Sequence, residues 1–204
     1  MNKYFWAVSI LVLTALGYFL STNQSKNTAT QTIKQENRPS TQVNSTECNK
    51  TPTPQLTEGP YYKFGAPLRT DLREEGTIGE PITITGFVYD TNCQKIAGAW
   101  IDFWQADGEG VYDNAGYKLR GHQFTDSLGK YTLNTVIPGK YPGRTPHIHV
   151  KLRATQNSPK ISSQLFMPGE SQNQTDPIFN KELIMEVKQT EEGKSATFDF
   201  VLTK

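Results

Sequence analysis

Two of the chain's three histidines, His147 and His149, stand one residue apart in the stretch GRTPHIHVKL. This stretch has the character of a β-strand, in which side chains at positions i and i+2 point to the same face. Two interpretations of a same-face pair are open. For an isolated His-X-His, a stacked, hydrogen-bonded structural pair is the commoner explanation, and the alternative is half of a metal site.

Two tyrosines favour the metal site. Tyr112 follows a glycine-rich turn in WQADGEGVY, and Tyr141 lies six residues before His147 in PGKYPGR. Two neutral imidazoles and two phenolates suit a hard, highly charged ion such as Fe(III), whereas zinc more often takes His, Cys or carboxylate ligands. A free phenol has a pKa near 10, so only a strong Lewis acid would hold it as phenolate at neutral pH. Fe(III), two phenolates and one hydroxide sum to zero charge.

Other polar residues near these positions carry little information when taken singly. Arg144 lies between Tyr141 and His147 and could be a solvated loop charge, and Gln164 lies downstream in SSQLF. The third histidine, His122, is expected to be a structural or surface residue rather than a further ligand. A lone tyrosine among nine is more often a half-buried aromatic than a ligand.

The elements that would position these residues are strands. PITITGFVYD (81–90) alternates and would place Ile82, Ile84 and Val88 on one face. Further strands are expected at 99–104, 129–136, 147–154, 182–187 and 195–202, with Phe198, Phe200 and Leu202 sharing a face in the last. Turn residues separate these runs, and no long helical periodicity or internal repeat is present. The pattern predicts an all-β fold, a β-sandwich with hairpin or Greek-key connections.

The N-terminal region has a different composition. Residues 1–20 contain Lys3 followed by an uncharged, mostly apolar run from Tyr4 to Leu20, which predicts a secretory signal peptide or a membrane anchor. The run is slightly short for a span of about 20 residues, and it has no clear cleavage site, so removal and retention are both open. Residues 21–47 are polar and are expected to form a disordered linker. The folded domain is expected at 48–204, outside the cytoplasm: periplasmic, extracellular or membrane-anchored.

Cysteine count and charge limit the alternatives further. In an exported protein the two cysteines, Cys48 and Cys93, predict one disulfide, worth up to roughly 4 kcal/mol in the loop-entropy model, rather than two free buried thiols. The formal net charge is +1, and no basic stripe is present. This distribution argues against a nucleic-acid partner.

Four stretches resemble the intradiol ring-cleavage dioxygenases, the group of catechol and protocatechuate dioxygenases. They are TEGPYY (57–62), GFVYDTNCQKIAGAWIDFWQADGEGVY (86–112), PGKYPGRTPHIHV (138–150) and SSQLF (162–166). They occur in the family's order and cover nearly all of 48–204. The resemblance is greatest to the exported single-domain branch, in which both cysteines recur.

The resemblance implies a β-sandwich with a non-haem Fe(III) site at one edge, one ion per chain. Residues that match the four metal ligands are Tyr112, Tyr141, His147 and His149. Tyr141 matches the ligand that leaves the metal and accepts a proton when substrate binds. Arg144 and Gln164 match residues that stabilise the activated substrate. Pro60 and its neighbours, including Tyr62, match a stretch that lines the substrate mouth, although packing against the sandwich is the favoured explanation of the tyrosines in this stretch.

One departure from the family concerns the substrate. Only Pro142 and Gly143 separate Tyr141 from Arg144, whereas the better-known enzymes of the resembled family carry a longer insertion there. A shorter loop implies a more open mouth and leaves the choice open between catechol, protocatechuate, hydroxyquinol and larger catechols. The chain also has no room for the helical dimerisation segment of catechol enzymes, so its oligomeric state is open.

Two functions from different classes follow. The first is an exported enzyme that cleaves a catechol-type ring with O2 to a cis,cis-muconate-type diacid. The second is an exported transthyretin-like or adhesin-like β-sandwich that binds a partner without catalysis, which the strand pattern alone would fit. The combination of two tyrosines with the histidine pair favours the enzyme, because a binding module does not need it. A zinc hydrolase is a weaker third option, since no carboxylate has a matching ligand spacing.

Overall fold

The computed structural model describes residues 50–191 and 193–204. The expected signal or anchor segment (1–20), the expected linker (21–47) and Cys48 lie outside these residues, so these features stay predictions. In the described ranges, no helix is long and apolar enough to cross a membrane.

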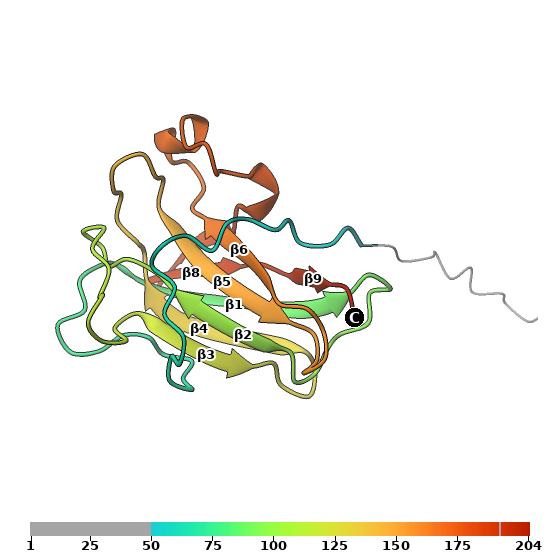
Figure 1. The fold of residues 1–204 in the computed structure, drawn as a ribbon. Coiled ribbons are helices and arrows are strands. Elements are labelled where there is room, and N and C mark those ends of the chain that lie inside the picture. Colours follow the sequence, from blue (N-terminus) through green and yellow to red (C-terminus); the bar gives the residue numbers. More distant parts are fainter. Residues whose placement is uncertain (1–49, 192) are drawn as a thin grey trace, which may run out of the picture. The chain divides into compact units, whose positions relative to one another are not determined.

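Two β-sheets face each other across one core (Figure 1). The first sheet has the order β4-β1-β8-β7, with β9 paired to β1, and the second has the order β3-β2-β5-β6. The strands of the first sheet are β1 (Pro81–Asp90), β4 (Lys130–Val136), β7 (Glu186–Thr190), β8 (Gly193–Thr197) and β9 (Phe200–Leu202). Those of the second are β2 (Trp100–Trp104), β3 (Arg120–Phe124), β5 (His147–Arg153) and β6 (Ile161–Phe166). The helices of the described residues are two short 3-10 turns, η1 (Ser171–Gln174) and η2 (Lys181–Leu183), so the expected all-β fold is confirmed.

The core forms where the alternating strands turn their apolar residues inward. The expected face of β1 is confirmed, because Ile82, Ile84 and Val88 are all buried. They meet the inward residues of the second sheet, which include Ile101 and Val150. Each such side chain contributes on the order of 1.5–3 kcal/mol by its burial. The same alternation turns every second residue of β2 and β5 to the outer face of the second sheet.

Cross-strand register arranges the outer face of the second sheet in rows, of which the one at the start of β5 is the pair His147 and Phe166. The site row is Arg120, Trp104, His149 and Gln164; the middle row is His122, Asp102, Lys151 and Ser162; the distal row is Phe124, Trp100 and Arg153. Successive rows are two residues, or roughly 6.6 Å, apart along the strands. This face therefore carries aromatic, basic and amide side chains where a solvent-facing sheet would carry small polar ones.

Residues 53–72 run across this outer face, as the cyan segment of Figure 1 shows. The amide of Leu56 donates to the Ser162 carbonyl (2.9 Å) beside β6, and the amide of Arg69 donates to the His122 carbonyl (3.0 Å) beside β3. At the far end the Leu72 amide donates to the Asn134 carbonyl (2.8 Å) on β4. The segment thus covers the outer face from one edge to the other and buries its site row.

Two strand predictions near the C-terminus are wrong in their bounds. The stretch 182–187 begins as the 3-10 turn η2, because the side chain of Asn180 accepts a hydrogen bond from the Glu182 amide (2.9 Å) and caps that turn. The stretch 195–202 is interrupted between β8 and β9, where the carboxylate of Asp199 accepts from the Phe87 amide (2.8 Å). Phe200 and Leu202 are nevertheless buried, as the alternation predicts.

The described chain begins beside the turn that carries Cys93. The Lys50 amide donates to the Thr91 carbonyl (3.0 Å), and the Lys50 ammonium lies 3.7 Å from the centroid of the Tyr89 ring. Lys50 is two residues from Cys48 in sequence, and Thr91 is two residues from Cys93. This placement is compatible with the expected Cys48–Cys93 disulfide, which stays a prediction.

Candidate metal centre

The two histidines of β5 direct one nitrogen each into the same space. His147 Nδ1 lies 2.6 Å from the Thr145 carbonyl oxygen, which can only accept, so Nδ1 carries the proton and Nε2 presents a lone pair. That Nε2 lies 3.1 Å from His149 Nε2 and 3.2 Å from the Tyr141 hydroxyl oxygen. Burial lowers the pKa of His147 to about 4 and that of His149 well below its ordinary value, so both rings are neutral at pH 7.

Packing fixes the ring of His149. Trp104 from the adjacent strand stacks on it, with ring centroids 4.8 Å apart and an interplanar angle of 8°. On another side the backbone passes close at Gly59, where a Cβ atom would lie 3.3 Å from His149 Cε1. Gly59 also has φ +73°, which favours glycine. Among the described residues, Nδ1 of His149 has no hydrogen-bond partner.

Tyr112 lies between two tight loops, and an aspartate side chain stabilises each loop by accepting backbone hydrogen bonds. The carboxylate of Asp107 accepts from the Val111 amide (2.9 Å), and that of Asp113 accepts from the Gly116 amide (2.7 Å), as in Asx turns. The Tyr112 hydroxyl is buried without a hydrogen-bond partner among the described residues. Burial, with a contribution from the nearby Tyr141, raises the pKa of Tyr112 well above its ordinary value. Such an orphaned phenol calls for a ligand that the protein itself does not supply.

A tight turn brings Tyr141 and Arg144 together. Pro142 and Gly143 occupy its two central positions, Gly143 has φ +76°, and the Arg144 amide donates to the Tyr141 carbonyl (3.0 Å). These are the features of a type II turn. The Arg144 guanidinium lies 3.4 Å from the Tyr141 hydroxyl. Burial raises the pKa of Tyr141, and the charge of Arg144 opposes that rise.

The Arg144 guanidinium is anchored on two further sides. Its Nε donates to both carboxylate oxygens of Asp176 (3.1 and 2.9 Å), and its Nη2 donates to Gln164 Oε1 (2.5 Å). Gln164 is oriented in turn, because its Nε2 donates to the Thr57 carbonyl (3.1 Å). These hydrogen bonds therefore fix the orientation of the planar guanidinium beside the Tyr141 hydroxyl.

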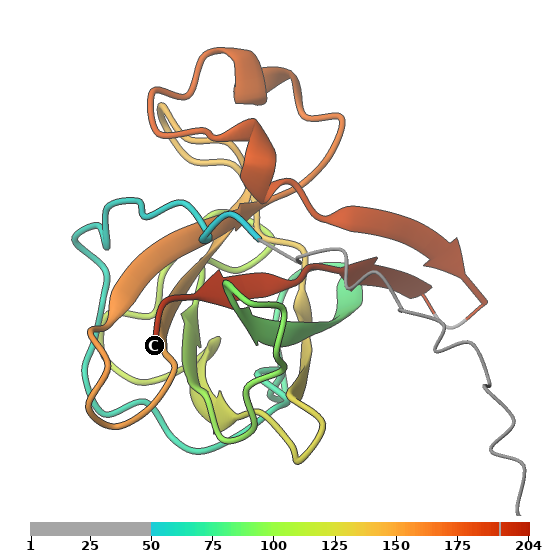
Figure 2. The same cartoon turned by 90° about the vertical axis from the view of Figure 1, so that its right-hand side faces the viewer.

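Asp176 belongs to a segment that rises from one end of the sheets, shown in orange in Figure 2 beside the loop that carries Arg144. Its buried carboxylate also accepts from the amides of Thr145 (3.0 Å) and Ile178 (2.8 Å). Burial opposes the charge, but these hydrogen bonds and Arg144 outweigh it, so the pKa of Asp176 is lowered. The sequence offered no signal for this residue, which lies 32 positions from Arg144.

The donor set fits a metal ion. Two ligands about 2.1 Å from one ion and at right angles to each other are roughly 3 Å apart, which is close to the separation of the two histidine Nε2 atoms. Within the described ranges, no three His, Cys, Asp or Glu side chains are grouped so that they could hold an ion. The tyrosine oxygens are needed to complete the set, and a set of two imidazoles and two phenols suits ferric iron better than zinc.

The TEGPYY stretch contributes Tyr61 to this centre rather than Tyr62. The Tyr61 ring stacks on Tyr112 with centroids 4.2 Å apart and meets Tyr141 edge-on at 6.4 Å. Tyr62 instead donates to the Asp102 carboxylate (3.2 Å) in the middle row and packs on Trp104. Pro60, between Gly59 and Tyr61, is exposed. The stretch has no regular period, so its sequence does not reveal which tyrosine turns inward.

Arg120 is a second arginine of the site, and no sequence signal singled it out. It is buried in the site row, and its Nη1 donates to the Tyr61 carbonyl (2.6 Å). Its Nη2 donates to the Asp113 carbonyl (3.1 Å), and the guanidinium lies 5.9 Å from the Tyr112 ring centroid. Burial lowers its pKa. Arg120 thus fastens the two segments that enclose Tyr112.

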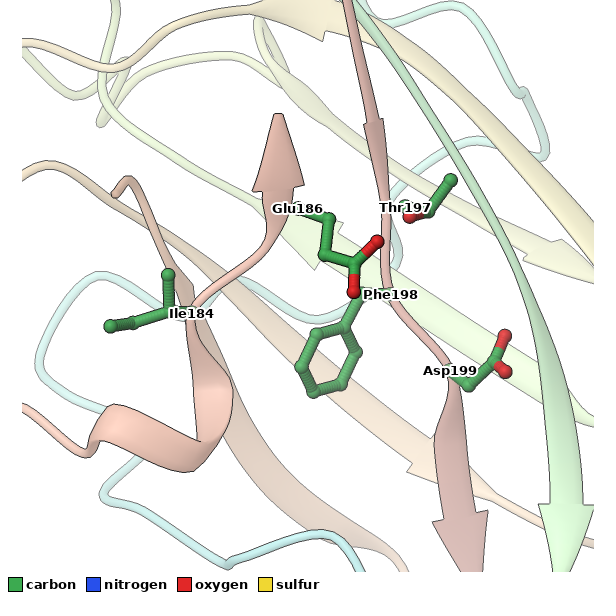
Figure 3. Close-up of a pocket in the computed structure, with 5 residues that line it drawn as sticks. All are labelled: Ile184, Glu186, Thr197, Phe198 and Asp199. Atoms are coloured by element: carbon green, nitrogen blue, oxygen red, sulfur yellow. The ribbon is translucent and has the colours of Figure 1, made fainter. Parts of the chain in front are cut away.

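A hollow elsewhere on the molecule lacks comparable groups. It has a volume of about 320 Å³, lies at the interruption between β8 and β9, and is lined by Ile184, Glu186, Thr197, Phe198 and Asp199 (Figure 3). Figure 3 shows two carboxylates there but no imidazole, phenol or guanidinium. The groups suited to ligate a metal and stabilise charge therefore gather at the site row and in the loops beside it, and not in this hollow.

The chain is similar in sequence to aromatic-ring dioxygenases. Residues 57–204 match the model of the family described as Dioxygenase. The alpha chain of protocatechuate 3,4-dioxygenase from Pseudomonas putida is 30% identical over 153 residues, which are 63% of this chain and 76% of the relative. Catechol 1,2-dioxygenase from Acinetobacter guillouiae is 28% identical over 146 residues, 58% of this chain and 48% of the relative.

Solved structures give the same result. The dioxygenase domain of a dioxygenase–carbohydrate-binding protein fusion from Streptomyces sp. SirexAA-E is 48% identical, with a TM-score of 0.72 over 75% of this chain and 99% of that one. The intradiol ring-cleavage dioxygenase from Tetranychus urticae is 26% identical, with a TM-score of 0.69 over 76% of this chain and 95% of that one. Taken with the site geometry, these matches show that the chain belongs to the intradiol ring-cleavage dioxygenases, a family of oxidoreductases.

Proposed function

We propose that this chain is a non-haem Fe(III)-dependent enzyme that opens a catechol-type ring between its two hydroxyl-bearing carbons and forms a cis,cis-muconate-type diacid. Tyr112, Tyr141, His147 and His149 would hold one ferric ion per chain. The observation that carries the proposal is the position of His147 Nε2, which lies 3.1 Å from His149 Nε2 and 3.2 Å from the Tyr141 hydroxyl. The buried, unpartnered hydroxyl of Tyr112 belongs to a ring whose centroid lies 5.9 Å from that of Tyr141.

The electrostatics of the described residues support a strongly charged cation. Burial raises the pKa of Tyr112 and of Tyr141, so both phenols keep their protons at neutral pH unless positive charge is bound beside them. When bound, ferric iron supplies Lewis acidity, which favours phenolate ligands and lowers the pKa of the hydroxyls of a catechol. The neutral imidazoles of His147 and His149 need no deprotonation before they can donate a lone pair.

The surroundings of Tyr141 support a role as acceptor of a proton from the substrate. Its phenol is half-buried and lies between Arg144 and His147, whereas Tyr112 is buried under Tyr61. Because burial favours the neutral phenol, a Tyr141 oxygen that no cation holds takes up a proton. We expect Tyr141 to leave the ion when substrate binds. Its phenolate oxygen would then accept one proton from the catechol.

Arg144 would stabilise negative charge on the ring. A guanidinium stays charged at any pH at which the protein is folded, and its fixed geometry needs little rearrangement as charge develops. Asp176 and Gln164 hold that geometry. Trp104 stacks on His149 within the sheet, and residues 53–72, here called the covering segment, run over the outer face, so that the site row is buried from water.

The short turn between Tyr141 and Arg144 supports an open mouth and a substrate range wider than catechol itself. We also propose that the enzyme is exported, with the N-terminal segment acting as its signal peptide or membrane anchor. A Cys48–Cys93 disulfide would link the end of the polar linker to the folded domain. Lys3 and the apolar run after it support export, and the Lys50–Thr91 hydrogen bond supports the disulfide.

The test of this function is the fate of oxygen. The full chain, loaded with ferric iron, is incubated with catechol, protocatechuate and hydroxyquinol under ¹⁸O₂. We expect one O2 consumed per ring opened, with one labelled atom in each new carboxylate of the product. An aldehyde-containing product from cleavage beside the hydroxyls, or no oxygen uptake with any catechol by the iron-loaded protein, would contradict it. The second outcome would favour the binding module.

A further inference from the structure

A separate pocket lies at the other end of the same sheet face. It has a volume of about 210 Å³. Its lining combines two residues of the distal row, two of the middle row, part of the covering segment and one loop residue: Trp100, Arg153, Asp102, His122, Tyr62, Phe64, Gly65, Ala66 and Lys160. Clefts that take drug-sized ligands run from about 300 to 1,000 Å³, so this pocket suits an occupant of a single ring. Tyr62 and Trp104 separate it from the metal centre, since the Tyr62 ring packs on Trp104 and Trp104 stacks on His149.

Two cations of the pocket have no acidic partner. The Arg153 guanidinium lies 5.5 Å and the Lys160 ammonium 5.0 Å from the centroid of the Trp100 ring. Neither makes an ion pair with a carboxylate in the part of the chain that the structure describes, whereas the nearby Lys151 pairs with Glu58. Two unpaired cations over one indole favour an anionic group, which can accept charge-assisted hydrogen bonds from both.

Two hydrogen-bond acceptors stand one row away. His122 Nδ1 donates to the Ala66 carbonyl (2.7 Å), so its Nε2 carries a lone pair in the neutral ring. Asp102 is buried, and its carboxylate accepts from Tyr62. Both residues lie in the middle row, roughly 6.6 Å along the strands from Trp100 and Arg153. A hydroxyl on the occupant could donate to either group.

The remaining surface around the pocket is aromatic and exposed. Phe64, which lines the pocket, is 79% exposed, and Phe124, beside Trp100 in the distal row, is 52% exposed. Phe124 also meets the His122 ring edge-on, with centroids 6.0 Å apart. Exposed aromatic side chains gathered around a pocket mark a binding surface more often than a bare solvent face. They suit a flat, apolar body such as a benzene ring.

We propose that this pocket binds a phenolic carboxylate, with the carboxylate at Arg153 and Lys160, the ring against Trp100 and Phe64, and the hydroxyl at Asp102 and His122. The ligand needs no vicinal hydroxyls and no iron. The proposal is therefore independent of the ring-cleavage function, and the pocket is a second site for small aromatic acids on the same sheet.

The experiment is a calorimetric titration of the full chain, with and without ferric iron, using 4-hydroxybenzoate. We expect saturable binding in both forms and at least a tenfold loss of affinity in Lys160→Glu. Lys188→Glu, on the exposed strand β7 of the other sheet, is the matched control and should leave the affinity unchanged. Benzoate, which lacks the ring hydroxyl, and 4-hydroxybenzyl alcohol, which lacks the carboxylate, should each bind more weakly than 4-hydroxybenzoate.

Two results would overturn the proposal. One is binding that disappears with the iron and is unchanged in Lys160→Glu, which would place the ligand at the metal centre. The other is no binding at millimolar ligand in either form. A Tyr141→Phe variant, which alters the metal centre alone, should keep its affinity for 4-hydroxybenzoate and so separates failure of this site from failure of the ring-cleavage site.

Discussion

The two sheets are built by the same alternation, yet their outer faces differ. On the first sheet the outer face of β1 and β4 is only partly buried, and Thr83 of β1 donates to the Asn134 side chain of β4 (2.9 Å), both being partly exposed. On the second sheet the outer site row is buried and carries Arg120, Trp104 and His149. The difference lies in the segment 53–72, which covers the second sheet and leaves most of the first open.

The covering segment also provides the partners that buried polar groups need. The Thr57 carbonyl accepts from Gln164, the Tyr61 carbonyl accepts from Arg120, and the Tyr62 hydroxyl donates to Asp102. Without such partners each buried polar group would cost on the order of 1–3 kcal/mol. The outer face of a sheet can therefore hold buried polar and metal-ligating side chains when a second segment excludes water from them and supplies their hydrogen-bond partners.

The largest expected difference between the two faces concerns metal. In His149→Phe the ring can still stack on Trp104, but the nitrogen donor is lost. We expect metal affinity to fall by more than about 100-fold and ring cleavage to fall to background. The measurement is iron content after dialysis, together with oxygen uptake. Thr83→Val on the open face is the control, and a similar loss of iron there would mean that the two faces do not differ as described.

A pH-dependent difference is expected from Asp102. Burial raises its pKa to about 6, from 3.8 in the unfolded chain. The stability that this group contributes is thus fully present below pH 3.8 and is lost as the pH rises through 6, by up to about 3 kcal/mol. In urea unfolding of the metal-free chain, Asp102→Asn should gain stability over the parent between pH 4 and 7. A difference that does not change with pH would contradict the assignment.

A smaller effect is expected from Asp176, which positions Arg144. In Asp176→Asn the guanidinium loses its ion pair, so kcat should fall by about 10- to 100-fold, while KM and iron content change little. Asp71→Asn is the matched control, because Asp71 pairs with Arg73 at the surface and such exposed pairs contribute little. Equal losses in both variants, or loss of iron from Asp176→Asn, would show a general structural role.

The smallest expected effect separates the two neighbouring tyrosines of the covering segment. Tyr61→Leu removes the ring that stacks on Tyr112 and should weaken iron binding by about 1 kcal/mol. Tyr62→Phe keeps its packing on Trp104 and should leave the absorption of the metal centre unchanged. If Tyr62→Phe proves the more damaging of the two at the metal centre, Tyr62 rather than Tyr61 lines it.

The sequence predicted the parts of this molecule that depend on regular periods. The strand 81–90 alternates strictly and is found with those bounds, and the His-X-His pair lies on one strand face as expected. The strands RGHQF and ISSQLF were not predicted, because their outward residues are too polar and their inward ones too few to show a clear alternation. The 3-10 turn at 181–183 replaced the start of a predicted strand for a local reason, the Asn180 cap.

Site residues could be predicted from the sequence only where a recognisable motif or a characteristic spacing marked them. Tyr112, Tyr141, Arg144 and Gln164 were singled out by the motifs around the histidines, and the structure brings them together. Asp176 and Arg120 reach the site by tertiary folding from segments without a motif. Their contribution depends on which loops meet in space, and no period along the chain encodes that.

The most direct test of the central claim is the iron content and visible spectrum of the purified full chain and its Tyr112→Phe variant, before and after addition of catechol. We predict one ferric ion per parent chain, a red colour from phenolate-to-iron charge transfer, and a shift of that band with catechol. Tyr112→Phe should fail to retain iron. Stoichiometric iron with an unchanged band in Tyr112→Phe would contradict the ligand set, and a parent chain that cannot be loaded with iron would contradict the metal centre itself.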